Sequence, residues 1–197
     1  PIEYISGQFI FVRFYNEKLS KESHPFSIAS KSNDLKIKII IKNLGDFTSN
    51  IHQVKVGDKV AIEGPYGRFI CNVNSNIVWI AGGIGITPFI GMAQCLKDKK
   101  SENKIDLYYS VKTEDELIAG NNFREIEKLN KNFRFFPWIT NDLGYLTLKY
   151  IIEKTGNLKD KEIYICGPPA FKKSLIESLK KEGINEDKIH EEDFNLR

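Results

Sequence analysis

A glycine-rich turn that joins an apolar strand to a helix constrains this chain most. Residues 76–82, NIVWIAG, form a continuous apolar run that suits a strand buried on both faces, and GGIGITP occupies residues 82–88. Glycine lets a backbone approach a ligand closely, and a helix N-terminus offers free N–H groups to a phosphate. We expect Thr87 to be the N-cap and Pro88 the first helical residue. The alternative is a turn without a ligand, because the run is neither G-x-G-x-x-G nor a P-loop.

Strands and helices alternate from this turn onwards. Apolar, β-prone runs predict further strands at residues 104–111, 133–140 and 162–167. Helices are predicted at residues 88–100, 122–131, 148–154 and 169–182. Thr147 is expected to cap the third of these helices, and Gly183 to stop the last. The alternation predicts a parallel sheet with helices on both faces.

The first part of the chain has a different pattern. Residues 7–15, 35–42 and 59–64 read as strands, and a short helical turn is expected near residues 48–54. Several short strands at this spacing predict a small antiparallel barrel. We therefore expect an all-β domain at residues 1–74 and an α/β domain at residues 75–197.

Composition excludes several classes of protein. The net charge is only +3, and acidic residues interrupt the lysines, which argues against a nucleic-acid binder. Cys71, Cys95 and Cys166 are too far apart in sequence for a metal clamp, so we expect no metal site and a reducing compartment. No run reads as a transmembrane helix or a signal peptide. The chain opens at Pro1 and its only methionine is Met92, so we expect a soluble fragment of a longer protein.

Three further motifs each allow a structural and a functional interpretation. Cys166 in ICGPPAF lies at the end of a predicted strand, where α/β proteins bind ligands, but this residue alone favours a buried structural cysteine. In HPFSIAS, Phe26 could offer a flat face to an aromatic ligand and Ser27 a hydroxyl donor. In the structural interpretation, Phe26 is a core side chain and Ser27 is a capping residue. Phe194 belongs to the terminal EEDFNLR, which is otherwise a frayed end.

The order of these motifs is more specific than any one of them. HPFSIAS, GDFTSN (45–50), GPYG (64–67), GGIGITP, CGPPAF and the terminal EDF together resemble the ferredoxin–NADP reductase superfamily. HPFS and GDFT look closest to the dehydrogenase domains of NADPH oxidases and ferric reductases. Many other members have Arg-x-Tyr-Ser/Thr at the first motif, where this chain has His24 and Phe26. An arginine would supply a permanently charged guanidinium that can donate two hydrogen bonds to a phosphate. Because His24 lacks this group, FAD is expected to bind loosely.

The resemblance implies two cofactors, FAD and NADPH, with NADH as the other possible donor. The residues that would face FAD are His24, Pro25, Phe26, Ser27, Lys42, Gly45 and Thr48. The residues that would receive the nicotinamide dinucleotide are Gly82, Gly83, Gly85, Thr87, Pro88, Ser110, Lys112, Cys166, Gly167 and Pro168. Ser27, Cys166 and Phe194 would lie nearest the reacting atoms, with Ser27 near flavin N5 and Phe194 covering the flavin. Lys112 favours NADPH, since its charge would suit a 2′-phosphate; a solvated surface lysine is the alternative.

The implied function is hydride transfer from NAD(P)H to FAD, followed by release of single electrons. The expected partner is a haem-containing transmembrane domain of the same parent chain, with this module on the cytoplasmic face of the membrane. One alternative is a soluble reductase that serves ferredoxin, flavodoxin or an oxygenase. Another is a non-catalytic regulatory protein that uses bound FAD to sense redox state.

Overall fold

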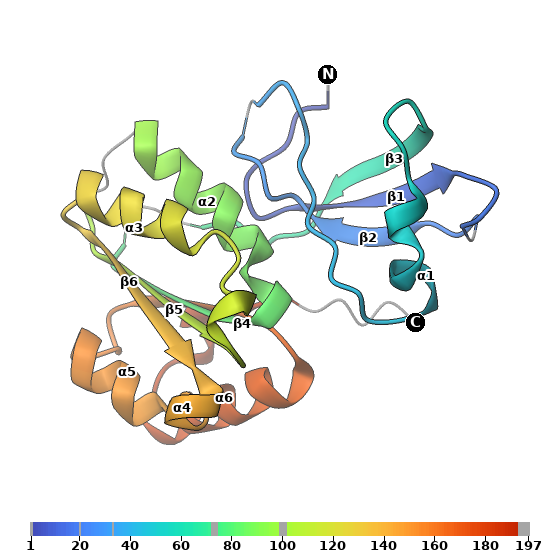
Figure 1. Ribbon diagram of the computed structural model, residues 1–197. Coiled ribbons are helices and arrows are strands. Elements are labelled where there is room, and N and C mark those ends of the chain that lie inside the picture. The colour runs from blue at the N-terminus through green and yellow to red at the C-terminus, as the bar shows by residue number, and fades with distance from the viewer. Residues whose placement is uncertain (1, 20, 33, 72–74, 99–101, 193–197) are drawn as a thin grey trace.

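The chain folds into two sheet-based halves that lie side by side (Figure 1). The computed structural model describes residues 2–19, 21–32, 34–71, 75–98 and 102–192. The antiparallel half comes first in sequence and the parallel half second, as the sequence patterns predict. The predicted boundary between residues 74 and 75 adjoins residues 72–74, which lie outside the described residues, and it stays a prediction.

The first half is built on three antiparallel strands in the order β2-β1-β3. Their bounds are β1 (Phe9–Tyr15), β2 (His24–Ser27) and β3 (Lys59–Tyr66). Along β1, the side chains of Ile10, Val12 and Phe14 are buried and form a core cluster with Ile28. The expected helical turn is present as α1 (Asp46–Ser49) and a 3₁₀ turn at Ile51–Gln53.

The predicted strand at residues 35–42 is wrong. Within that segment only Ile39 makes a β-bridge, to Ile28. Ile37, Ile39 and Ile41 pack against the core of the first half, so the alternation reflects an extended segment with one buried face. An alternating pattern reports burial on one side of the chain, but it does not supply a neighbouring strand to pair with.

The second half is a parallel sheet in the order β6-β5-β4-β7-β8. The bounds are β4 (Ile77–Gly82), β5 (Ile105–Val111), β6 (Phe133–Ile139), β7 (Glu162–Cys166) and β8 (Ile189–Glu191). Every residue of β4 and of β5 is buried, which agrees with their continuous apolar sequences. The strand β8 was not predicted, because three residues are too few to show a period.

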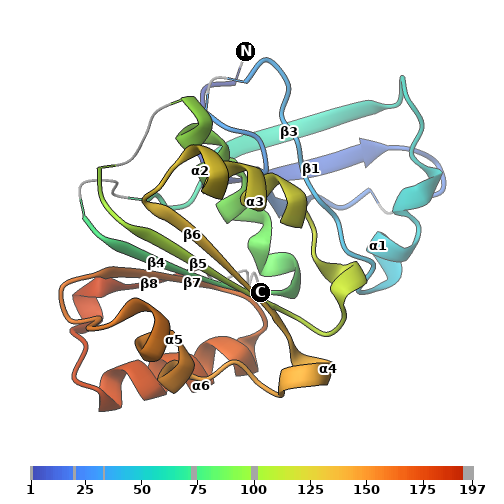
Figure 2. The same ribbon diagram turned by 60° about the vertical axis from the view of Figure 1, so that its left-hand side comes forward.

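Helices cover both faces of this sheet, as predicted. Their bounds are α2 (Thr87–Asp98), α3 (Gly120–Leu129), α4 (Thr140–Leu143), α5 (Leu148–Thr155) and α6 (Pro169–Lys181). Figure 2 shows α2 and α3 on one face and α5 and α6 on the other. The Thr147 hydroxyl accepts a hydrogen bond from the Tyr150 N–H at 3.3 Å, which confirms the predicted cap. Among the residues that the structure describes, no helix has the length and hydropathy of a membrane span.

Helix α2 also packs against the first half. One core cluster contains Ile90 and Met92 from α2 together with Ala29 and Phe69 from the antiparallel half. The Ser6 hydroxyl lies 3.5 Å from the Cys95 sulfur across the same boundary. The two halves therefore share a hydrophobic core and form one continuous body along this helix.

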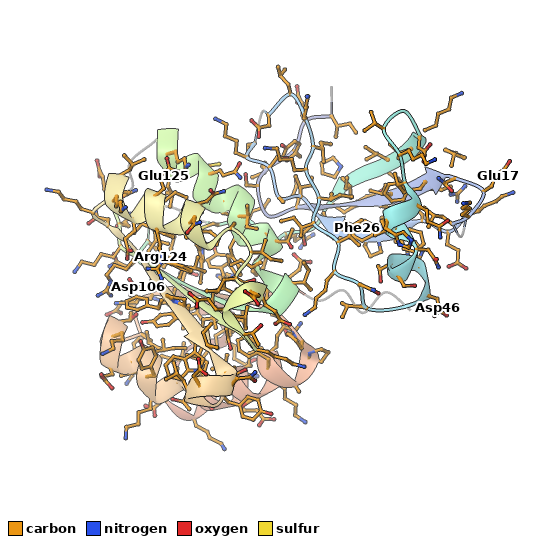
Figure 3. All side chains as sticks on the ribbon, viewed as in Figure 1. Glu17, Phe26, Asp46, Asp106, Arg124 and Glu125 are labelled. Atoms are coloured by element: carbon orange, nitrogen blue, oxygen red, sulfur yellow. The ribbon has the colours of Figure 1, made fainter. Side chains whose placement is uncertain are left out.

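A buried carboxylate ties the amino ends of β5 and β6 together. Asp106 accepts two hydrogen bonds from the Arg134 guanidinium, at 2.7 and 2.6 Å, and one from the Thr155 hydroxyl at 2.5 Å. Asp106 is 2% exposed and lies in the parallel half, well apart from Phe26 in the other half (Figure 3). This network is therefore structural.

We expect Asp106→Ala to lower the free energy of unfolding by roughly 1–3 kcal/mol, because the Arg134 guanidinium and the Thr155 hydroxyl lose the buried carboxylate that accepts their hydrogen bonds. Urea unfolding followed by circular dichroism measures this change. Glu153→Ala removes an exposed carboxylate paired with Lys154 and serves as the control, with no measurable change expected. Equal stabilities of the two variants would contradict the structural role of Asp106.

Candidate functional site

The turns after β4 and β7 meet at the carboxyl edge of the parallel sheet. The strand order reverses here, since β5 and β6 lie on one side of β4 and β7 and β8 on the other. The turn after β4 is a 3₁₀ helix, Gly83–Ile86, that leads into α2. Open α/β sheets bind ligands in the crevice outside such a reversal.

A cavity of about 190 Å³ opens between the two halves at this point. Its predicted members come from four segments: Pro25, Phe26, Ser27, Lys42, Thr48, Gly85, Thr87, Cys166 and Gly167. Ile40, Ile41, Leu44 and Ile84 give it further apolar walls. We call this space the first cavity. Phe26 and Ser27 of the first half and Cys166 of the second half all line the first cavity, as the resemblance implies.

A larger cavity of about 480 Å³ lies at the carboxyl edge of the parallel sheet. Its predicted members are Lys42, Gly82, Gly83, Ser110, Lys112 and Pro168. We call this space the second cavity. Lys42 lines both cavities, and the turns at residues 82–85 and 166–168 contribute residues to each. The two spaces therefore adjoin along the sheet reversal.

The glycines of this region have two different roles. A Cβ on Gly85 would lie 2.4 Å from the Cys166 carbonyl oxygen, so this glycine allows two backbones to touch. A Cβ on Gly82 or Gly167 would come within 3.0 Å of the Phe171 ring. Gly83 has a φ of +53° and open space where its side chain would be. Of these glycines, Gly83 is the one whose backbone faces a cavity without a packing partner at its Cβ position.

The expected N-cap at Thr87 is wrong. The helical backbone already begins with the 3₁₀ turn at Gly83, and Thr87 itself has α-helical angles. Its hydroxyl donates to the Ile84 carbonyl oxygen at 2.8 Å and so caps no N–H group. Pro88 is the second residue of α2, is buried, and lines neither cavity. The helical run at this edge therefore begins at Gly83, so its first N–H groups are those of the Gly83–Ile86 turn.

Two predicted FAD-facing residues, His24 and Gly45, line neither cavity. The His24 ring stacks on Phe47 with centroids 3.7 Å apart, and its Nε2 lies 3.9 Å from a Glu22 carboxylate oxygen. Gly45 is exposed, and its N–H donates to the Thr48 hydroxyl at 3.0 Å. Phe194 lies outside the described residues. The roles of these residues stay predictions.

Two functional candidates of the second cavity escaped the sequence analysis. Glu116 lies in a 3₁₀ turn after β5; its carboxylate accepts the Lys112 N–H at 3.2 Å and lies 3.7 Å from the Lys42 ammonium. Tyr145 follows α4, lines the second cavity and is 89% exposed. A large exposed ring at a cavity is a surface that a ligand can cover. In the sequence, Glu116 is one of several acidic residues in a turn and Tyr145 is a single tyrosine. Neither belongs to a motif of distinctive spacing, so the sequence offers no reason to select them.

Cys166 is a neutral thiol in this site. Burial raises the pKa of its thiol to about 12, and the nearby Glu192 carboxylate adds to that shift. At physiological pH the sulfur is protonated and is therefore a poor nucleophile. Cys166 can pack against a ligand or donate weakly to it without adding charge.

A buried lysine holds the last described residues against this part of the sheet. The Lys172 ammonium, on α6, donates to the Glu192 carbonyl oxygen at 2.7 Å and pairs with Glu191 at 3.1 Å. Lys172 is 6% exposed and Glu192 is 8% exposed. The segment that precedes Phe194 is thus fixed near Cys166.

The two cavities fit the two expected dinucleotides. The first cavity has an aromatic ring, aliphatic walls and few charges, which suits a flat heteroaromatic ring. The second cavity combines the open backbone at Gly83 with the Lys42 and Lys112 side chains, which suits a pyrophosphate. The residues present therefore fit FAD in the first cavity and a nicotinamide dinucleotide in the second.

We expect Cys166 to resist alkylation in the folded protein up to about pH 9, its ordinary pKa, since only the thiolate reacts. Mass spectrometry after iodoacetamide treatment should show labelling at least roughly 100-fold slower than in the urea-unfolded chain. The free energy of unfolding should also fall above about pH 9, where the unfolded thiol ionises and the folded one does not. Labelling of the folded protein with a midpoint at or below pH 9 would contradict this environment.

Two family models match the chain, one in each half. An FAD-binding domain model matches residues 1–69, and an oxidoreductase NAD-binding domain model matches residues 79–176. A component protein of the Na(+)-translocating NADH-quinone reductase of Haemophilus ducreyi is 30% identical over 164 residues, which are 76% of this chain and 40% of that protein. The corresponding protein of Yersinia pestis gives the same identity and coverage. The chain thus spans about two fifths of the curated relatives that it matches.

Solved structures share the fold at low identity. The cytochrome P450 reductase GcoB of Amycolatopsis has a TM-score of 0.85 at 22% identity, over 98% of this chain and 62% of its own. The flavohaem-like FAD/NAD-binding domain of a Vibrio cholerae nitric oxide dioxygenase has a TM-score of 0.85 at 23% identity, over 97% and 85%. Ferredoxin–NADP⁺ reductase of Plasmodium falciparum has a TM-score of 0.81 at 23% identity, over 96% and 83%. With its antiparallel and parallel halves, the chain belongs to the ferredoxin–NADP reductase superfamily, as an oxidoreductase module with one FAD-binding and one NAD-binding domain.

Proposed function

We propose that this module moves a hydride from NAD(P)H to FAD and passes the electrons onward one at a time. The observation that carries the proposal is the meeting of the two cavities along the sheet reversal, with Lys42 in both. FAD, when bound, supplies the atom that accepts the hydride and the capacity to release two electrons singly. The hydride takes both electrons of the C4–H bond that breaks, so the dinucleotide leaves as NAD(P)⁺.

Residues of the first cavity would orient the reacting rings and exclude water. Phe26 offers a face to the isoalloxazine, and the Ser27 hydroxyl, 7% exposed as a residue, is a donor beside it. Cys166 forms the opposite wall as a neutral thiol. Close, dry positioning of donor and acceptor is the main protein contribution to a hydride transfer, because no acid or base is required.

Residues of the second cavity would hold the dinucleotide. The backbone at Gly83 would face the pyrophosphate, and Lys42 would add positive charge beside it. Tyr145 would stack on the nucleotide base. Both NADPH and NADH are compatible with this set: Lys112 would attract a 2′-phosphate, whereas the Glu116 carboxylate, which accepts the Lys112 N–H, would repel one.

The direct test is anaerobic absorbance of the FAD-loaded chain after addition of NADPH or NADH. We expect rapid bleaching of the flavin by at least one donor, and the faster donor is the preferred substrate. No bleaching with FAD demonstrably bound would contradict the proposal and favour the non-catalytic, redox-sensing alternative.

We expect Tyr145→Ala to weaken NAD(P)⁺ binding roughly 10-fold, since an aromatic ring that stacks on a base contributes about 1–3 kcal/mol. Isothermal titration calorimetry with NAD⁺ and NADP⁺ measures the change. Tyr15→Ala, which removes a 59% exposed tyrosine from the antiparallel half, is the matched control and should bind normally. Equal affinities of the two variants would show that Tyr145 does not contact the dinucleotide.

For the electron acceptor we propose the haem of a transmembrane domain in the same parent protein, of the NADPH-oxidase or ferric-reductase type. The module would then lie at the cytoplasmic face of the membrane. Support comes from the likeness of HPFS and GDFT to that group. The parent sequence should contain membrane helices with paired histidines. A short polar leader in their place would favour a soluble reductase, an alternative consistent with folds such as those of GcoB and ferredoxin–NADP⁺ reductase.

A further inference from the structure

The backbone of helix α2 touches the backbone of the antiparallel half at one glycine. A Cβ on Gly91 would lie 2.6 Å from the Ser30 carbonyl oxygen and 3.2 Å from that of Ile28. A carbon and a carbonyl oxygen ordinarily stay about 3.3 Å or more apart. Gly91 is buried, so any other residue at this position would have to push the two halves apart.

This contact is close to the first cavity on both sides. On the α2 side, Thr87 lines the cavity and lies one helical turn before Gly91, about 6 Å along the helix axis. On the other side, Ser27 lines the cavity and directly precedes Ile28. The backbone contact at Gly91 therefore lies next to both walls of the first cavity and limits how closely those walls approach each other.

The surface that Gly91 meets is held firmly. The Ser30 hydroxyl lies 2.7 Å from the Tyr4 hydroxyl and accepts the Lys38 N–H at 3.1 Å. Ala29 donates its N–H to the Lys38 carbonyl oxygen at 2.8 Å. Ser30 is fully buried. A side chain added at Gly91 would thus displace α2 rather than residues 28–30, which these hydrogen bonds hold in place.

The next residue of α2 makes a second close approach. A Cβ on Gly7, which has a φ of +103°, would lie 2.4 Å from the Met92 methyl carbon and 2.1 Å from the Phe69 carbonyl oxygen. Of these two glycines, only Gly91 brings the backbone of α2 against the backbone of the antiparallel half, because the contact of Gly7 with α2 is to the end of the flexible Met92 side chain. Gly91 is the more informative to change, because it has helical angles that alanine also adopts.

We propose that Gly91 is a positioning residue for hydride transfer: its bare backbone sets the spacing between the flavin wall and the dinucleotide wall of the site. This inference rests on the function proposed above. An added methyl group must move α2 by up to about 1 Å, and displacements of that size slow positioned reactions by up to about 100-fold. The substitution changes the spacing between the halves but none of the side chains that line either cavity, so the affinities for FAD and for NAD⁺ should change much less than the rate of hydride transfer.

The experiment compares Gly91→Ala with Gly120→Ala and the unaltered chain. Gly120 is the matched control, because it also belongs to a helix of the parallel half and its added Cβ meets only Leu117, at 3.6 Å. The readouts are the FAD dissociation constant from flavin fluorescence, the NAD⁺ dissociation constant from calorimetry, the melting temperature, and the anaerobic rate of flavin bleaching. The long-wavelength charge-transfer absorbance that appears when a nicotinamide contacts a flavin reports the spacing without turnover.

We expect Gly91→Ala to bind FAD and NAD⁺ within about threefold of the unaltered chain, while bleaching slows roughly 10- to 100-fold and the charge-transfer band weakens. Gly120→Ala should match the unaltered chain in all of these. Normal bleaching and a normal band in Gly91→Ala, even with a lower melting temperature, would overturn the inference. If Gly91→Ala binds neither ligand and loses its cooperative thermal transition, Gly91 serves folding and the inference is wrong. If NAD(P)H does not bleach the flavin bound to the unaltered chain, the proposed function itself is contradicted.

Discussion

The close approach of backbone turns along α2 is the constraint on which the rest of the site depends. At the carboxyl edge of the parallel sheet, Gly85 lets the turn after β4 contact the Cys166 carbonyl at the end of β7. In α2, the helix that follows this turn, Gly91 lets the helix backbone lie against the carbonyls of Ile28 and Ser30. Side chains at these places would separate the very segments that line the first cavity. Gly85 and Gly91 are therefore needed for the short distance between these backbone segments and not for flexibility of a loop.

The chemistry follows from the two cavities that this packing leaves. The first is lined by side chains from both halves and is largely apolar; the second lies at the carboxyl edge of the parallel sheet and carries the lysines. Cys166 is neutral because it is buried, and Lys172 holds Glu191 and Glu192 beside it. Such an arrangement can align two flat rings in a dry space and needs no proton-transferring group, which suits hydride transfer.

The sequence predicts the architecture well where one physical signal dominates. Continuous apolar runs at β4 and β5 identify strands buried on both faces, and Thr147 caps its helix because a hydroxyl there satisfies a free N–H. Prediction fails where the outcome depends on partners distant in sequence. Residues 35–42 alternate like a strand but have only the Ile39 bridge to Ile28, and Thr87 bonds backwards to Ile84 because the helical turn begins earlier. For the site, the motifs bring Phe26, Ser27 and Cys166 together, whereas Tyr145 and Glu116 reach the second cavity through folding alone.

The assignment of one cavity to each cofactor is the central claim, and a crystal structure of the chain with FAD and NAD⁺ tests it most directly. We expect the isoalloxazine in the first cavity, beside Ser27 and Cys166, and the dinucleotide in the second, with its base against Tyr145 and its nicotinamide reaching the flavin at the sheet reversal. A flavin ring in the second cavity, or two rings held apart by protein side chains, would contradict the account.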